Sequence, residues 1–145
     1  MDIVHDLFLN YYFLTFIAAW ITSILLKAGL HSWKIRRRFN LKDGFQNGGM
    51  PSSHTTIVSA LTFSLLFRTG LSDLFFISAI FALIVMSDAI RIRKNVGLQG
   101  EKLNELLKKF DEKTIRVVYG HSFAQVFAGM VLGLFCAFIF KIILF

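Results

Sequence analysis

Two long stretches of this chain carry no charged side chain, and they restrict the possible folds more than any other feature. Residues 7–26 form an uncharged, mostly apolar run of twenty positions, and residues 122–140 form another of nineteen. At 1.5 Å per residue, a helix of about twenty residues crosses the roughly 30 Å hydrocarbon core of a bilayer. Inside lipid, a helix pairs its own backbone polar groups. The sequence therefore predicts an all-α integral membrane protein.

Two shorter apolar runs lie between these stretches, at residues 55–67 and 74–86, with thirteen residues each. Each reaches spanning length when its capping or turn residues are added. We therefore expect a bundle of four transmembrane helices, at about 7–28, 51–68, 71–89 and 121–143, within one membrane-embedded domain over residues 1–145. A content of 55% hydrophobic residues with 17 Phe fits a membrane protein. Buried helices of a soluble protein are the alternative for the two short runs.

A secretory signal is the competing interpretation of the first apolar run. The six residues before it are acidic rather than basic, and no small-residue cleavage site precedes Lys27. We therefore expect this run to be a spanning helix.

The basic residues gather in two loops on one side of the predicted membrane. Of the 16 Lys and Arg residues, 13 fall within residues 29–53 or 90–120. Basic loops stay at the cytoplasmic side, so both loops should lie inside and both termini outside. The net charge of +7 then follows from topology, and it requires no nucleic-acid partner. The expected environment is a lipid bilayer, with the polar site at its cytoplasmic face.

The second basic loop has its own periodicity. Leu103, Leu106, Leu107 and Phe110 recur at helical spacing, with charged residues around them. This pattern predicts an amphipathic helix over about 98–112, lying on the inner membrane surface or on the bundle.

The stretch Gly48-Gly49-Met50-Pro51-Ser52-Ser53-His54 is typical of a loop that turns into a helix. Glycines permit a sharp bend, Pro51 suits a first helical turn, and Ser52 or Ser53 can cap. A helix N-terminus offers free backbone N–H groups and a positive dipole, so it binds anions such as phosphate. His54 would stand ready for proton transfer. A capped helix that simply enters a core would carry the same residues.

The predicted topology collects polar residues at the inner ends of the four spans. On the last span, Gln125, Gly129 and Gly133 follow His121 along one helical stripe, and the small residues should bring another helix close. The gathering of two histidines with cationic residues favours a functional site. The single cysteine, Cys136, lies in an apolar run, and we expect no metal and no cofactor. The gathered residues are Lys27, Ser52, Ser53, His54, Asp88, Arg91, Arg93, Arg116 and His121.

These motifs, in order, resemble the divergent branch of the type 2 phosphatidic acid phosphatase superfamily, which also includes bacterial acid phosphatases and vanadium haloperoxidases. The likeness extends from Lys27 to Gly133. It rests on Gly48–Thr55, on Ser87-Asp88-Ala89 with the basic residues that follow, on Gln99 with Leu103-Asn104, and on Gly120-His121. By resemblance, Lys27 is the lysine of the first motif, Ser52, Ser53 and His54 fill the second, and His121 is the nucleophile of the third.

The resemblance implies a metal-independent phosphatase. His121 would attack phosphorus to form a phosphohistidine, and His54 would protonate the departing alkoxide and later help to activate water. Lys27, Arg93 and the seryl hydroxyls would neutralise the equatorial phosphoryl oxygens.

The chain departs from the family pattern at two places. The branch usually has an acidic residue four positions after the nucleophile, where this chain has Gln125; an amide can orient the ring but supplies no charge. Arg116 lies five residues before His121 instead of six, so Arg93 is the better candidate for the third-motif arginine. Asp88 could pair with Arg91 or Arg93, or replace the missing carboxylate.

Two hypotheses follow. The first is a lipid-phosphate phosphatase that acts on a phosphatidylglycerophosphate, phosphatidate or polyprenyl phosphate type of headgroup. The second is a non-catalytic membrane protein that keeps the anion pocket to bind a headgroup or a partner. Because four spans are few for a pocket in a membrane, the sequence is also compatible with a homodimer.

Overall fold

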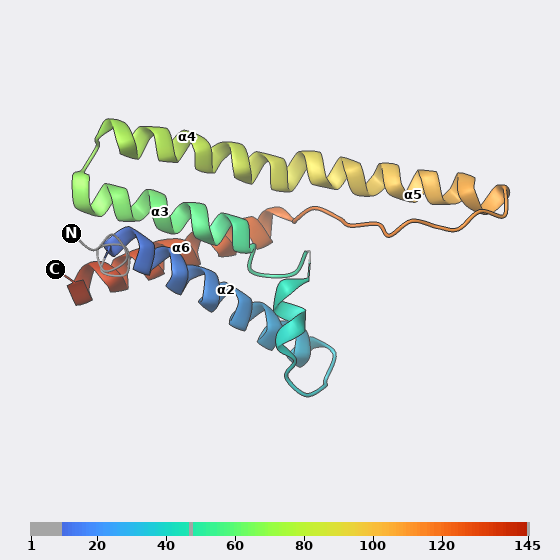
Figure 1. The fold of residues 1–145 in the computed structure, drawn as a ribbon, viewed down its shortest axis with the longest axis horizontal. Coiled ribbons are helices and arrows are strands. Elements are labelled where there is room, and N and C mark those ends of the chain that lie inside the picture. Colours follow the sequence, from blue (N-terminus) through green and yellow to red (C-terminus); the bar gives the residue numbers. More distant parts are fainter. Residues whose placement is uncertain (1–9, 47, 145) are drawn as a thin grey trace, which may run out of the picture.

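The computed structural model describes residues 10–46 and 48–144, and helices are the only regular secondary structure in this part of the chain (Figure 1). The all-α prediction is therefore confirmed. The elements, in order, are α2 (Tyr11–Lys34), the short 3-10 helix η1 (Leu41–Phe45), α3 (Ser53–Thr69), α4 (Asp73–Ser87), the π-helical turn η2 (Asp88–Ile92), α5 (Arg93–Lys109) and α6 (Phe123–Leu144).

Three helical segments of the described chain are long and apolar enough to cross a membrane: Tyr11–Lys34, Asp73–Lys109 and Phe123–Leu144. Helix α3 corresponds to the expected span over 51–68, the second of the four. It has 17 residues and a polar, serine- and threonine-rich face. It packs most extensively against α6 and also contacts α4 and α2. This central position explains its composition, because its buried hydroxyls contact protein rather than lipid. The predicted start of the first span, residue 7, lies outside the described residues.

The contact between α3 and α6 depends on small residues, as the glycine stripe predicts. A Cβ atom added at Gly129 would lie 2.6 Å from the carbonyl oxygen of Ser52, and one at Gly133 would lie 2.5 Å from that of Thr56. Neither position can hold a side chain without separating the helices. Ala19, Ala60 and Cys136 complete the buried core of α2, α3 and α6.

The expected loop after residue 90 is wrong in its first half, because α4 continues through η2 into α5 as one helix of 37 residues. The chain has a single proline, at position 51, and no glycine between Gly70 and Gly97, so nothing ends the helix near residue 90. The amphipathic helix exists, but α5 begins at Arg93 and ends at Lys109 rather than covering 98–112.

Helix α5 extends away from the bundle, and the non-helical segment that follows runs back beside it (Figure 1). The side chain of Asn104 holds this returning segment: its oxygen accepts from the backbone N–H of Ile115 at 2.8 Å, and its nitrogen donates to the carbonyl oxygen of Ile115 at 2.9 Å. Gly97 and Gly100 allow Tyr119 and Val117 to approach α5 closely. The returning segment thereby brings His121 back to the bundle.

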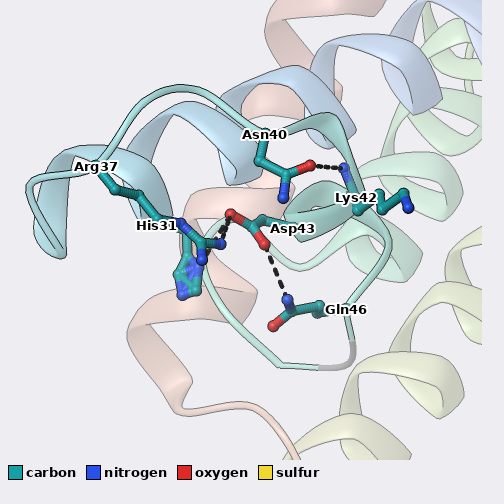
Figure 2. Close-up of polar contacts among 6 residues, drawn as sticks. All are labelled: His31, Arg37, Asn40, Lys42, Asp43 and Gln46. Carbon is teal, nitrogen blue, oxygen red and sulfur yellow. Dashed lines mark hydrogen bonds and ion pairs between the residues drawn. The ribbon is translucent and has the colours of Figure 1, made fainter.

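The end of α2 and the start of α3 are joined by a loop that η1 anchors. Gly44 of η1 packs so closely on α2 that an added Cβ would lie 2.5 Å from the carbonyl oxygen of Ile24. The carboxylate of Asp43, only 2% exposed, accepts hydrogen bonds from Arg37 and from the side-chain amide of Gln46 (Figure 2). This arrangement fixes the loop against α2 just before the two glycines.

Candidate active site

One cavity of about 240 Å³ collects most of the polar residues that the sequence singles out. They come from separate elements: α2, the start of α3, the start of α5 and the residues just before α6. Aromatic and aliphatic side chains, including Trp20, Phe45 and Tyr119, form most of the remaining wall, together with Gly44, Gln46 and Gly48. The fold thus joins motifs that lie far apart in the sequence. The predicted site residues in this wall are Lys27, Ser53, His54, Arg93 and His121.

His121 is held by both its backbone and its ring. Its backbone N–H donates to the carbonyl oxygen of Ala89 at 2.9 Å. Its ring Nδ1 lies 3.2 Å from Oε1 of Gln125, and the same oxygen accepts the backbone N–H of Ser122 at 2.9 Å. Because an amide oxygen only accepts, Nδ1 carries the proton in this contact. Nε2 is then left with a free lone pair.

Ser122 and Gln125 form a reciprocal cap at the start of α6. The hydroxyl of Ser122 accepts the backbone N–H of Gln125 at 3.3 Å, while the Gln125 side chain accepts the N–H of Ser122. This is a capping box, with a glutamine in the third helical position. The same side chain therefore begins the helix and orients the imidazole.

The imidazole of His121 is only 8% exposed. Burial lowers the pKa of His121 most; the hydrogen bond to Gln125 raises it, and the nearby charges of Lys27, His54 and Arg93 lower it further. The pKa of His121 therefore lies below the ordinary histidine value of about 6.5. At neutral pH the ring is therefore uncharged and can act as a nucleophile.

Two donors in the cavity are poorly satisfied by protein atoms. The ammonium of Lys27 donates to the backbone oxygen of Gln46 at a long 3.4 Å, and its side chain is 7% exposed. The hydroxyl of Ser53 is buried, and within the described chain it has no hydrogen-bond partner. Buried polar groups without partners are costly, so both favour an added acceptor such as a phosphate oxygen.

The glycine loop brings its backbone close to Lys27. Gly48 and Gly49 have φ values of 83° and 77°, in the left-handed region that glycine adopts without strain. A Cβ added at Gly49 would lie 3.4 Å from Cγ of Lys27. Pro51 precedes the helix instead of entering its first turn, because α3 begins at Ser53.

The remaining predicted residues lie outside this cavity. Ser52 caps α3: its Oγ accepts the hydroxyl of Thr55 at 3.0 Å and the backbone N–H of Thr55 at 3.5 Å. Arg116 and Gln125 line a neighbouring cavity of about 300 Å³. Asp88 pairs with Arg93, with 2.7 Å between Oδ2 and Nε, so its carboxylate holds that guanidinium rather than the His121 ring.

Sequence reasoning missed the loop residues that support Lys27. Gln46 accepts from Lys27 through its backbone and donates to Asp43 through its side chain. Nothing in the sequence pattern marks Gln46, because a polar residue in a basic loop is ordinary. Tyr119, two positions before His121, also lines the cavity, and its hydroxyl donates to Glu101.

Comparisons with known proteins identify the family of the chain. A family model described as the divergent PAP2 family matches residues 8–136. YuiD, an uncharacterized membrane protein of Bacillus subtilis (strain 168), is 31% identical over 147 residues, which cover 89% of this chain and 92% of that protein. No solved structure matches. The family match includes every residue in the wall of the cavity, and it covers far more than half of the sequence. The chain belongs to the divergent PAP2 family.

Proposed function

We propose that this protein is a membrane phosphatase that hydrolyses a phosphomonoester or pyrophosphate headgroup of a lipid. The observation that carries the proposal is the meeting of Lys27, Ser53, His54, Arg93 and His121 in one cavity. Membership of the divergent PAP2 family supports it. Substrates of the phosphatidylglycerophosphate, phosphatidate or polyprenyl phosphate type carry the required headgroup.

In this proposal the phosphate sits among cationic and neutral donors. Lys27 and Arg93 supply positive charge, Ser53 supplies a hydroxyl, and the first turn of α3 supplies backbone N–H groups. Such donors stabilise the charge that builds up on the equatorial oxygens in the transition state. Asp88 holds the Arg93 guanidinium beside the cavity through its ion pair.

The chemical steps use the two histidines. The Nε2 lone pair of His121 attacks phosphorus and forms a bond between phosphorus and nitrogen. The bond between phosphorus and the leaving oxygen breaks, its electron pair stays on that oxygen, and His54 donates a proton to it. Water then attacks the phosphohistidine, His54 takes the proton of the water, and the bond between phosphorus and nitrogen breaks. His54 is exposed, so it can exchange protons with solvent.

Phosphate release from a panel of lipid phosphates in detergent tests the proposal, and the chain offers a matched pair of arginines. Arg93 lines the cavity and Arg116 does not. Arg93→Ala should lower kcat/KM by about 100-fold or more, the usual cost of losing a transition-state donor. Arg116→Ala should change it only slightly. Equal losses in both variants, or activity that survives His121→Ala, would contradict the assignment.

A non-catalytic function remains the second candidate, because Gln125 stands where the family usually has a carboxylate. In that case the same cavity binds a lipid headgroup or the anionic part of a partner. Vanadate should bind and stabilise the protein under either function. Only the enzyme would release phosphate from a lipid, so the two measurements together separate the candidates.

A further inference from the structure

A second cavity adjoins the first and is larger, with a volume of about 530 Å³. Lys27, Gln46 and Gly48 belong to the walls of both cavities, so the two spaces meet along these residues. This volume falls in the usual range of small-molecule sites, about 300–1,000 Å³. The first cavity takes the proposed phosphate, and the second is not used by that chemistry.

The wall of the second cavity is mostly apolar. Leu30, Trp33, Ile35 and Met50 line it, and they are 43%, 80%, 44% and 45% exposed. Leu30 and Trp33 lie near the end of α2, which is a candidate span, and Ile35 directly follows it. Tryptophan is enriched at such membrane interfaces. The cavity therefore opens where α2 would leave the hydrocarbon region.

Basic side chains accompany these apolar side chains. His31 and Lys34 belong to the same wall. The Asp43 carboxylate is also in it, but this group already accepts hydrogen bonds from Arg37 and Gln46 (Figure 2). An apolar space with basic residues at its edge matches the part of an anionic lipid just below its headgroup.

We propose that this second cavity holds the headgroup-proximal hydrocarbon of the same lipid whose phosphate lies in the first cavity. This inference rests on the proposed function. A lipid phosphate needs an apolar space that adjoins its phosphate site, and the 530 Å³ cavity provides one. The other neighbouring cavity is smaller, about 300 Å³, and its wall is more polar: it contains Val117, Val118 and Tyr119 together with glycines, Arg116 and Gln125. Leu30, Trp33, Ile35 and Met50 are then the residues that select amphiphilic phosphates over soluble ones.

The two tryptophans of the chain allow a direct test, because Trp20 lines the first cavity and Trp33 lines the second. Trp20→Phe leaves Trp33 as the only tryptophan, and Trp33→Phe leaves Trp20. The probe is dodecylphosphonate with bromine on the chain carbons nearest the phosphonate, added to the whole protein in detergent. Bromine quenches the fluorescence of a nearby indole. Dodecanol brominated at the same carbons, which lacks the phosphonate, is the control for partition into the micelle.

We expect the phosphonate to quench Trp33 more strongly than it quenches Trp20, and we expect vanadate to reverse the Trp33 quenching by competing for the first cavity. Quenching by dodecanol should not respond to vanadate. The inference is overturned if the phosphonate quenches Trp33 no more than dodecanol does, or if vanadate leaves the quenching unchanged. This measurement needs no turnover, so it stands apart from the failure or success of the phosphatase proposal.

Kinetics on a chain-length series give a second readout. The kcat/KM for alkyl phosphates should rise with each methylene that enters the cavity. Leu30→Ser should lower kcat/KM for a dodecyl phosphate by about tenfold and leave that for a methyl phosphate nearly unchanged. Leu25→Ser is the matched control, because Leu25 lies on the same helix, is 47% exposed and does not line this cavity. Equal losses in both variants, or equal losses for both substrates, would refute the assignment.

Discussion

Gln125 links two functions in one side chain: it caps α6 and it accepts the Nδ1 proton of His121. A glutamate at this position would keep the capping box, since glutamate and glutamine both serve there. It would also place a negative charge beside the ring. This makes position 125 a place where charge can be changed with the geometry retained.

Gln125→Glu should therefore raise the rate of phosphate release. A carboxylate beside Nδ1 stabilises the positive imidazole that develops as Nε2 bonds to phosphorus. A gain of roughly tenfold corresponds to about 1.4 kcal/mol in the transition state. The measurement is kcat for one lipid phosphate, with His121→Ala as the inactive control. An unchanged rate would show that Gln125 only positions the ring.

The pH dependence should follow the same imidazole. Because burial depresses the pKa of His121, the neutral nucleophile persists to a pH below the ordinary histidine value of about 6.5. On the alkaline side, kcat/KM should fall once His54 loses the proton that it donates to the leaving oxygen. On the acid side, kcat/KM should fall as the pH falls through the depressed pKa of His121. Gln125→Glu should raise the pKa and move this fall to higher pH. A profile with no loss of activity on its acid side would contradict a neutral His121 nucleophile.

The sequence motifs predict the polar residues Lys27, Ser53, His54, Arg93 and His121 of the first cavity, but they do not predict the rest of its wall. They also separate neighbours of similar chemistry poorly. Ser52 and Ser53 both precede an apolar run, and which one caps depends on where α3 begins. Arg93 and Arg116 are both near motif residues; the spacing of Arg116 from His121 already favours Arg93, and the path of α5 brings Arg93 to the cavity. These choices depend on backbone geometry that no single residue type encodes.

At the scale of elements, the contact between α3 and α6 holds the second and third motifs together. The two helices approach each other closely at Gly129 and Gly133. The backbone N–H of Ser52 also donates to the carbonyl oxygen of Gln125 at 3.1 Å. The glycine spacing predicts this contact from the sequence. The sequence does not predict that α4 and α5 form one helix. The first half is apolar and the second is charged, so the change in composition near residue 90 suggests a loop, although the helix continues from Asp73 to Lys109.

Gly133→Ala should destabilise the protein by about 1–3 kcal/mol, the usual cost of overpacking a tight contact. The added methyl group would meet the carbonyl oxygen of Thr56. Gly29→Ala is the matched control in another spanning helix, since nothing lies within 4 Å of its added Cβ. The control should be neutral or slightly stabilising, because alanine favours helices. Thermal unfolding in detergent measures both, and equal stabilities would argue against the glycine contact.

At the scale of the whole molecule, the helices place both described ends and the α3–α4 turn at one end of the bundle (Figure 1). The η1 loop and α5 lie toward the other end, with the candidate site between them. The basic loops therefore accompany the site, which fits the charge asymmetry in the sequence.

Tag accessibility in intact cells should find both termini outside and residue 42 inside. The reason is that 13 of the 16 basic residues fall in the two loops on the side of residue 42. A cysteine introduced at Lys42 should resist a membrane-impermeant thiol reagent until the cells are opened, whereas one at Leu71, in the α3–α4 turn, should react at once. Labelling of residue 42 in intact cells would show that the predicted topology is inverted.

The π turn between α4 and α5 holds one residue more than an ordinary helical turn: Arg93 donates its backbone N–H to Asp88, five residues earlier. Deletion of Ile90 would turn this hydrogen bond into the ordinary α-helical one, which joins residues four positions apart. The helices on both sides would then keep the same residues facing the bundle and the same axis directions. The cost would fall on the Ala89 carbonyl, which now accepts the backbone N–H of His121. In an unbroken α-helix that carbonyl points along the axis. The additional residue thus positions His121 rather than the helices, and we expect a chain that lacks it to fold without the hydrogen bond between the His121 backbone N–H and the Ala89 carbonyl oxygen.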